Sequence, residues 1–256
     1  MTTTPTKRLK MEGVRKRFGA THALRGVSFE VGPSEVHTLI GENGAGKSTL
    51  MKILSGVHKP DEGSILLDGS PFNPSNPHHA RMCGIAMIYQ ELNLAPDLSV
   101  MENITLGDEP SALGWRRISE QKARATEALQ QLEHEQLPLD IPVNRLSIAE
   151  QQVVEIARAL IGKPKVLIMD EPTNDLDVDT LRALEEALLG FPGSAIVVSH
   201  DRWFLDRIAT HILAFEGNSE VVWFEGNYDA YAEDLKRRKG ADADRPHRIK
   251  FKPLSR

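Results

Sequence analysis

Short apolar runs bounded by turn residues alternate along the chain with longer stretches in which apolar residues recur at helical spacing. This alternation is typical of an α/β protein built from strand–helix units. Four nearly continuous apolar runs predict buried strands of a parallel core sheet, at residues 36–40, 85–89, 165–169 and 195–199. Three further runs predict peripheral antiparallel strands, at residues 27–31, 64–67 and 221–224. The pattern therefore predicts a parallel core sheet with an antiparallel side sheet.

The stretches with helical spacing predict helices at residues 47–55, 120–133, 148–161, 179–189, 203–208 and 228–239. Residues 90–145 contain few strand-like runs, which indicates a helical subdomain over about residues 90–160. We expect one folded domain over residues 1–235 and a separate tail over residues 236–256. In the helix at 203–208, we expect Trp203 and Phe204 to lie in the core.

Length and composition agree with a single domain, because 40% of the 256 residues are apolar and can form a buried core. No stretch approaches the roughly 18 to 20 apolar residues that a membrane helix needs, and the first ten residues lack the apolar segment of a signal peptide. The single cysteine, Cys83, cannot form an internal disulfide, which agrees with a reducing compartment. We therefore expect a cytoplasmic protein.

Charge is unevenly distributed along the chain. The formal net charge is −5, yet residues 236–256 contain nine Lys or Arg and two Asp, a local charge of +7. Such a run is usually a solvated chain end. The alternative is contact with nucleic acid or with acidic lipid.

A glycine-rich segment follows the predicted strand at 36–40 and opens the predicted helix at 47–55. It fits the phosphate-loop pattern and consists of Gly41, Glu42, Asn43, Gly44, Ala45, Gly46, Lys47, Ser48 and Thr49. In such a loop the backbone N–H groups turn toward phosphates, and the helix N-terminus adds its positive end. Lys47 is expected to reach the β and γ phosphates, and Ser48 to ligate Mg²⁺.

Other polar residues follow predicted core strands, whose carboxyl ends meet at one edge of a parallel sheet. Asp170 and Glu171 end an apolar strand, which places a Mg²⁺-positioning acid beside a base for the attacking water. An isolated acidic pair is more often a helix cap, but the phosphate loop favours the catalytic interpretation. His200 could contact the γ-phosphate, and Gln90 could contact Mg²⁺ or the water. A polar cap is the alternative for His200.

The motifs together resemble those of an ATP-binding cassette (ABC) ATPase over nearly the whole chain. They occur in the family's order, with the phosphate loop followed by Gln90, Leu146-Ser-Ile-Ala-Glu-Gln-Gln152, Met169-Asp-Glu-Pro-Thr173, Asp177 and His200. The resemblance implies a phosphate-loop NTPase fold of the ABC type that binds ATP and Mg²⁺ and hydrolyses ATP as a dimer.

Three further roles are implied by this resemblance alone. Phe18 falls where an aromatic ring stacks on adenine, although it could be a core residue. Ser147 falls in the signature segment that reaches across the dimer to the γ-phosphate of the other protomer. Asp177 falls in the loop that contacts the partner subunit. One chain would then supply only part of each site.

The signature segment departs from the usual Leu-Ser-Gly-Gly-Gln at Ile148, Ala149 and Glu150. Side chains at Ile148 and Ala149 restrict the approach of the backbone to phosphate, and the Glu150 carboxylate adds repulsion. A homodimer would then hydrolyse ATP slowly, or the chain would pair with a second cassette. The longer string over residues 146–158 resembles monosaccharide importers, so the departure could also be a family variant.

The two parts of the chain resemble two different ABC families. Residues 9–161 resemble the first cassette of bacterial ribose, xylose and galactose importers, including Tyr89-Gln-Glu-Leu-Asn-Leu-Ala-Pro96. Residues 166–256 resemble the C-terminal cassette of ABC-F translation factors, including Glu171-Pro-Thr-Asn-Asp-Leu-Asp177 and Ser199-His-Asp-Arg-Trp-Phe-Leu205. The chain therefore has the character of a hybrid.

The importer resemblance implies an ATP-binding subunit on the cytoplasmic face of the inner membrane, where the region after Gln90 meets a sugar permease. The translation-factor resemblance implies a ribosome-associated ATPase fragment that contacts RNA through its basic tail. That family carries two cassettes and a charged linker in one chain, which are not found in this sequence. We favour the importer interpretation. An ATP-binding module without a working partner is a third alternative.

Overall fold

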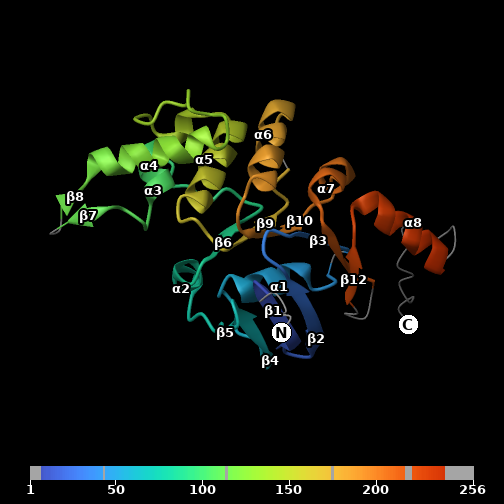
Figure 1. Cartoon of the computed structure of the whole chain (residues 1–256). Coiled ribbons are helices and arrows are strands. Elements are labelled where there is room, and N and C mark those ends of the chain that lie inside the picture. The colour runs from blue at the N-terminus through green and yellow to red at the C-terminus, as the bar shows by residue number, and fades with distance from the viewer. Residues whose placement is uncertain (1–6, 43, 113–114, 174–175, 217–220, 240–256) are drawn as a thin grey trace, which may run out of the picture.

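A six-stranded sheet with the strand order β12–β11–β3–β10–β9–β6 lies at the centre of the fold (Figure 1). The computed structural model describes residues 7–42, 44–112, 115–173, 176–216 and 221–239. The strands are β3 (Val36–Gly41), β6 (Ile85–Ile88), β9 (Val166–Asp170), β10 (Ser194–Val198), β11 (His211–Phe215) and β12 (Val221–Glu225). Only β12 pairs antiparallel, with β11. The predicted parallel core sheet is confirmed.

The side sheet is antiparallel, with the order β2–β1–β4–β5. Its strands are β1 (Leu9–Phe18), β2 (Thr21–Val31), β4 (Glu62–Leu67) and β5 (Ser70–Pro71). The predicted strands at 27–31 and 64–67 lie within β2 and β4. We did not predict β1, because its buried residues Met11 and Val14 are three positions apart and break strict alternation. A register shift between them, next to Gly13 at φ 59°, accounts for this spacing.

Helix α1 (Lys47–Leu54) lies between the two sheets (Figure 1). Apolar side chains from both sheets fill the space around it. Leu50 and Ile53 of α1 are buried in one cluster with Leu9 of β1 and Leu39 of β3. Burying each such side chain contributes about 1.5–3 kcal/mol. The helix that follows the glycine-rich loop is therefore fixed between the two sheets.

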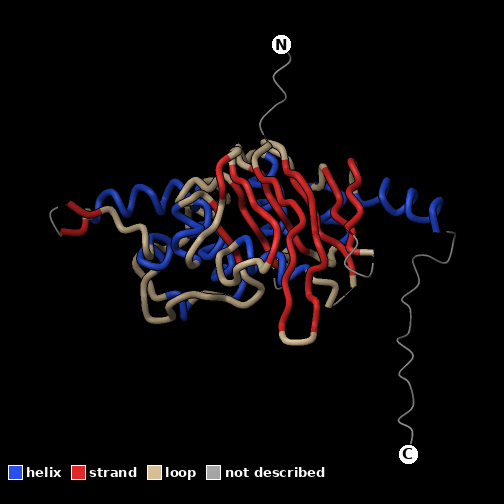
Figure 2. Tube along the Cα trace, turned by 90° about the horizontal axis from the view of Figure 1, so that it is seen from below, coloured by secondary structure: helices blue, strands red, loops and turns tan. Residues whose placement is uncertain are grey.

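The other face of the core sheet packs against a helical region. This region contains α3 (Val100–Thr105), α4 (Ile118–Gln130), α5 (Ile148–Leu160) and the short pair β7 (Ser111–Ala112) and β8 (Trp115–Arg116). Its buried Ile104, Ala125 and Val153 share a cluster with Leu167 of β9 and Val197 of β10. Figure 2 shows these helices on one side of the strands and the last helix, α8 (Tyr228–Lys239), on the opposite side.

The remaining helices are α2 (Pro77–Met82), α6 (Val178–Leu189) and α7 (Arg202–Ile208). We did not predict α2 and α3, which have six residues each and give little periodic signal. On α7 the side chain of Phe204 is fully buried, but Trp203 is 81% exposed, so the expectation that Trp203 belongs to the core was wrong. Successive residues of a helix point about 100° apart, so only one of the two faces the sheet. Among the described residues, no helix combines the length and the apolar character needed to cross a membrane.

Three neighbouring parallel strands position the candidate site. Their carboxyl ends lie at one edge of the sheet, because β10 pairs in parallel with both β3 and β9. The glycine-rich loop follows β3, Asp170 ends β9, and His200 lies two residues beyond the end of β10.

Candidate active site

A cavity of ≈500 Å³ lies at this edge of the core sheet. Nine predicted site residues line it, namely Gln90, Asp170, Glu171, His200, Gly44, Gly46, Lys47, Ser48 and Thr49. The structure also adds lining residues that we did not predict, Val198 and the segment Thr21, His22 and Ala23 of β2. The only sequence signal for this β2 segment is its closeness to Phe18.

Two glycines of the loop have conformations and neighbours that exclude a side chain. Gly41 has φ 144°, and a Cβ there would lie 2.7 Å from the backbone oxygen of Phe215. Gly46, the N-cap of α1, has φ 107°, and a Cβ there would lie 2.6 Å from the backbone oxygen of Ala23. Left-handed backbone and close approach both require glycine. These glycines therefore let the loop pack against β11 and β2 and turn into α1.

Lys47 is nearly buried at the start of α1, with 7% of its surface exposed. Its Nζ donates hydrogen bonds to the carbonyl oxygens of Gly41 at 2.6 Å and Glu42 at 3.1 Å. Burial lowers the pKa of Lys47, and the negative charges of Glu171 and Asp170 oppose this shift. The ammonium group is thus held over the loop, on the side where the two carboxylates lie.

Asp170 ends β9, Glu171 follows it, and both line the same cavity. Burial and the neighbouring Glu171 charge raise the pKa of Asp170, while Lys47 acts in the opposite direction. Glu171 is 9% exposed and has φ 51°, a left-handed conformation that is unusual for a residue other than glycine. Its N–H donates to the carbonyl oxygen of Val198 at 2.8 Å. Such conformations cluster at functional sites, where the surrounding structure holds them.

His200 contacts both carboxylate oxygens of Glu171. Its backbone N–H donates to Glu171 Oε2 at 3.1 Å, and its ring Nε2 lies 3.3 Å from Glu171 Oε1. The side chain of His200 is 69% exposed toward solvent, whereas that of Glu171 is 10% exposed. The carboxylate is therefore fixed from the β10 side and oriented by a histidine that faces the open part of the cavity.

These groups fit a Mg²⁺-bound nucleoside triphosphate. The N-terminus of α1 and the Lys47 ammonium suit phosphate oxygens. Ser48, Asp170 and Gln90 present the oxygen ligands that Mg²⁺ prefers. Gly41, Glu42 and Ala45 complete the loop without lining the cavity, and Ala45 N–H donates to the carbonyl oxygen of Glu42 at 3.2 Å. Asn43 lies outside the described residues.

Three predicted residues lie apart from the cavity lining. Phe18 is 44% exposed at the end of β1, with its ring edge-on to His58 at 5.2 Å. Ser147 is the exposed N-cap of α5, and Asp177 is the N-cap of α6. The structure of a single chain does not bring Ser147 to the phosphate loop, which is the arrangement that a site completed by a second subunit needs. Their predicted roles stay predictions.

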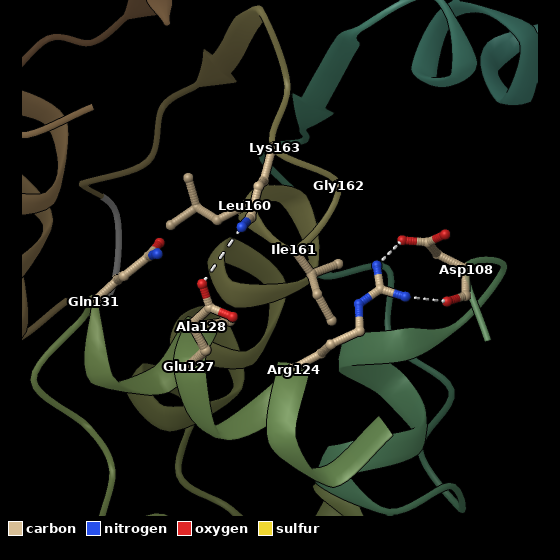
Figure 3. Close-up of a pocket in the computed structure, with 9 residues that line it drawn as sticks. All are labelled: Asp108, Arg124, Glu127, Ala128, Gln131, Leu160, Ile161, Gly162 and Lys163. Atoms are coloured by element: carbon tan, nitrogen blue, oxygen red, sulfur yellow. Dashed lines mark hydrogen bonds and ion pairs between the residues drawn. The ribbon is translucent and has the colours of Figure 1, made fainter. Parts of the chain in front are cut away.

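A second cavity, of ≈380 Å³, lies between α4 and the end of α5 (Figure 3). Arg124 forms an ion pair with Asp108. Lys163 Nζ lies 3.5 Å from Glu127 Oε1 across the cavity. Ala128, Leu160 and Ile161 also line it. Because its charged groups are paired with one another and the loop residues do not line it, this cavity has no chemistry in common with the first.

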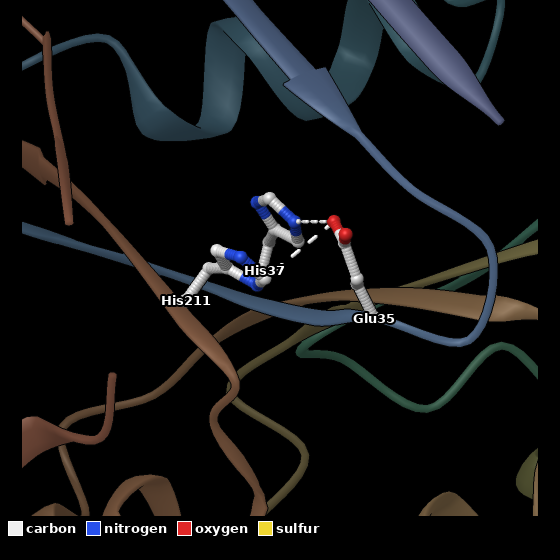
Figure 4. A group of neighbouring side chains, drawn as sticks. All are labelled: Glu35, His37 and His211. Carbon is white, nitrogen blue, oxygen red and sulfur yellow. Dashed lines mark hydrogen bonds and ion pairs between the residues drawn. The ribbon is translucent and has the colours of Figure 1, made fainter. Parts of the chain in front are cut away.

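A buried histidine pair lies at the opposite edge of the core sheet (Figure 4). The rings of His37 and His211 stack with centroids 4.4 Å apart, and His37 Nε2 lies 2.7 Å from Glu35 Oε2. These three residues have the donor atoms of a metal site. However, one ion cannot lie in the planes of two stacked rings, and His211 Nδ1 is hydrogen-bonded to Thr210 Oγ1 at 2.8 Å. The arrangement favours a stacked histidine pair in which His37 is hydrogen-bonded to Glu35 and His211 to Thr210.

The fold and the first cavity define a phosphate-loop nucleotide-binding cassette. A family model described as ABC transporter matches residues 24–174, more than half of the chain. The chain therefore belongs to the ABC transporter family of ATP-binding cassettes.

Curated relatives include both groups that the sequence resembles, and both resemblances are confirmed. Ribose import ATP-binding protein RbsA 2 of Streptomyces avermitilis is 48% identical over 202 residues, which are 77% of this chain and 40% of the relative. The energy-dependent translational throttle protein EttA of Escherichia coli is 38% identical over 254 residues, which are 98% of this chain and 42% of the relative. The chain thus spans less than half of the length of these relatives.

Solved structures of similar fold are also ABC cassettes. A structure of MJ1267, an ATP-binding cassette of an ABC transporter, has a TM-score of 0.79 and 25% identity, covering 94% of this chain and 99% of that chain. A dimeric post-hydrolysis state of the cassette MJ0796 bound to ADP and Pi has a TM-score of 0.70 and 28% identity, covering 85% of this chain and 98% of that chain.

Proposed function

We propose that this chain binds MgATP in the ≈500 Å³ cavity and hydrolyses it with Glu171 as the base. The observation that carries the proposal is that one cavity joins Lys47 and Ser48 of the phosphate loop to the carboxylates Asp170 and Glu171. Membership of the ABC family supports the same activity.

Each residue has a separate task in this proposal. The loop and Lys47 bind the β and γ phosphates, and Ser48, Asp170 and Gln90 hold Mg²⁺. When held by these three residues, Mg²⁺ would supply positive charge to offset the negative charge that develops on the phosphate during transfer. Glu171 accepts a proton from the attacking water, and His200 orients the carboxylate and contacts the γ-phosphate. Orientation and charge stabilisation supply most of the catalysis in phosphoryl transfer.

A second cassette completes the site. The single-chain structure leaves Ser147 at an exposed helix end, from which it can reach the nucleotide of a partner protomer. The dimeric relative bound to ADP and Pi supports this assembly. The partner is either a second copy of this chain or a different cassette.

Transport coupling is the specific role that we favour. The importer relative shares 48% of aligned residues. A groove of ≈280 Å³ lies beside the segment after Gln90, lined among others by His78, Arg81, Tyr89 and Leu106. A groove with both apolar and basic residues suits an apolar helix of a permease that carries an acidic residue. The chain would then act at the cytoplasmic face of the inner membrane as the ATP-binding subunit of a monosaccharide importer.

Ribosome association is the second candidate. The EttA relative aligns over 98% of the chain, and Lys236 and Arg237, the first two residues of the basic tail, are exposed on α8. In this role α8 and the tail would contact RNA phosphates, and binding would weaken steeply with salt. Most of the tail lies outside the described residues.

Three measurements test these proposals in turn. ATP hydrolysis per chain should rise with protein concentration if the site is completed in a dimer; the same rate at every concentration would exclude a composite site. Stimulation of hydrolysis by a ribose-type permease in liposomes would support the importer role. Ribosome co-sedimentation that is lost on deletion of residues 236–256 would support the translation role instead.

A further inference from the structure

Two side chains of α5 bind both polar backbone groups of Asn93, three residues after Gln90. The N–H of Asn93 donates to Glu155 Oε2 at 3.2 Å, and its carbonyl oxygen accepts from Arg158 Nη1 at 2.8 Å. The two side chains also pair with each other, with Arg158 Nη2 3.1 Å from Glu155 Oε1. We call these three residues the Asn93 clamp. It fixes the loop that carries Gln90 to one turn of α5.

The Asn93 clamp is buried, so the loss of hydration of its two charges offsets much of the stability that the ion pair adds. The side chains of Glu155 and Arg158 are only 4% and 17% exposed. Burial raises the pKa of Glu155, although the Asn93 N–H and the Arg158 charge favour its ionised form. A buried ion pair often adds little net stability compared with apolar side chains, because both charges lose their hydration. What such a pair does provide is a defined geometry for the groups that it binds.

Both ends of the clamp lead to the proposed reaction site. Gln90 lines the nucleotide cavity, and α5 begins at the signature residue Ser147. A small cavity of ≈10 Å³ on the same side of α5 is lined by Tyr89, Gln152, Glu155 and Glu171. The helix that carries Ser147 at its N-terminus therefore also lines a cavity with Glu171 and holds the Gln90 loop.

We infer that Glu155 and Arg158 are positioning residues that place Gln90 at the nucleotide and make its position follow that of α5. The inference rests on the proposed function, in which Gln90 contacts Mg²⁺ or the attacking water. When the N-terminus of α5 binds a partner's γ-phosphate and the helix moves, the clamp makes the Gln90 loop move with it. Closure of the dimer and completion of the Mg²⁺ site then occur together.

The experiment compares four single variants, Glu155→Ala, Glu155→Gln, Gln90→Ala and the control Glu127→Ala, with the double variant Gln90→Ala/Glu155→Ala. The control breaks the exposed Lys163–Glu127 pair in the same helical region. Glu155→Ala should lower kcat about tenfold, with KM for ATP changed less than twofold, the pattern for lost transition-state geometry. Glu155→Gln should recover most of the rate, because its amide oxygen still accepts from Asn93. Glu127→Ala should match the unmodified chain.

The double variant separates positioning from a general loss of stability. If Glu155 acts through Gln90, Gln90→Ala/Glu155→Ala should be no slower than Gln90→Ala alone, within about twofold. The inference would be overturned if the two rate losses multiplied in the double variant. An unchanged rate in Glu155→Ala would also overturn it. If neither the unmodified chain nor a mixture with another cassette hydrolyses ATP, the proposed function fails and the inference falls with it.

Amide hydrogen exchange gives a readout that needs no activity. The Asn93 N–H should exchange at least tenfold faster in Glu155→Ala than in Glu127→Ala, while amides of the buried strand β9 stay protected in both. Equal exchange at Asn93 in the two variants would show that the clamp does not form in solution. Loss of protection throughout β9 would show general unfolding; the double-variant comparison is then made with Arg158→Gln, which removes the charged contact to the Asn93 carbonyl oxygen.

Discussion

His200 contacts both oxygens of the Glu171 carboxylate, one through its backbone N–H at 3.1 Å and the other through its ring Nε2 at 3.3 Å. Because the backbone contact survives any substitution of the ring, Glu171 keeps one fixed oxygen in every His200 variant. Glu171 itself has no substitute in the cavity under the proposed function, which assigns Asp170 to Mg²⁺. The two residues should therefore differ in what their loss does to turnover.

Glu171→Gln should lower ATP turnover by at least a hundredfold while leaving ATP binding within a fewfold, because a positioned base contributes roughly 10²–10⁴. The ATP turnover of His200→Ala should lie between that of Glu171→Gln and that of the unmodified chain. Phosphate release measures turnover, and equilibrium binding of a fluorescent ATP analogue measures affinity. Size-exclusion chromatography in MgATP should show a dimer for Glu171→Gln. Turnover of Glu171→Gln at the unmodified rate would refute the catalytic role.

Lys47→Ala should weaken MgATP binding at least tenfold, because the ammonium group is held over the phosphate loop by Gly41 and Glu42. Lys52→Ala is the matched control, since Lys52 lies on the same helix with an exposed side chain. Removing the Lys52 charge should change affinity less than twofold. Isothermal titration with MgATP compares the two. Equal losses would mean that net charge, and not the Lys47 contact, determines affinity.

The core sheet could be predicted because its strands are continuous apolar runs between turn residues. Where tertiary contacts override the local pattern, prediction failed. The strand β11 is fully buried, yet its polar first residue, His211, obscured the signal of a buried strand. For Trp203 and Phe204, apolar character alone could not tell which side chain faces the sheet.

The site could be predicted to the extent that it is local. The phosphate loop and the residues after β9 and β10 owe their positions to the strand that precedes each, so sequence order fixes their place. The contribution of Thr21, His22 and Ala23 depends on how β2 packs against Gly46, which no motif encodes. The Asn93 clamp likewise joins residues 62 and 65 positions apart.

The capping box at Ser147 leads to a prediction about dimer formation. Ser147 N–H and Oγ both donate to Glu150 Oε2 at 2.8 Å, so a carboxylate takes up the groups that a partner's γ-phosphate needs. Glu150→Gln keeps a capping box, since glutamine also serves at this position, but removes the negative charge. In the Glu171→Gln background it should strengthen the ATP-dependent dimer about three- to tenfold, measured by analytical ultracentrifugation.

Glu102 supplies a control within the same chain. Ser99 N–H and Oγ donate to Glu102 Oε2 at 3.0 and 2.8 Å, the same capping box on α3. Glu102→Gln should leave the dimer unchanged. If both Gln variants strengthen the dimer equally, the effect comes from net charge. If Glu150→Gln weakens it, the carboxylate does not compete with phosphate.

His37 should make stability depend on pH between about 4 and 6.5. Burial lowers its pKa from 6.5 to about 4, outweighing the hydrogen bond that His37 donates to Glu35, and the stacked His211 and the Lys7 charge also lower it. In this window the unfolded chain binds a proton that the folded chain does not, so the free energy of unfolding falls as pH decreases, by up to about 3 kcal/mol. His37→Phe keeps a stacked ring and should flatten this slope in urea melts; His78→Phe, at an exposed histidine, should not. Parallel slopes for His37→Phe and the unmodified chain would mean that His37 titrates normally in the folded protein.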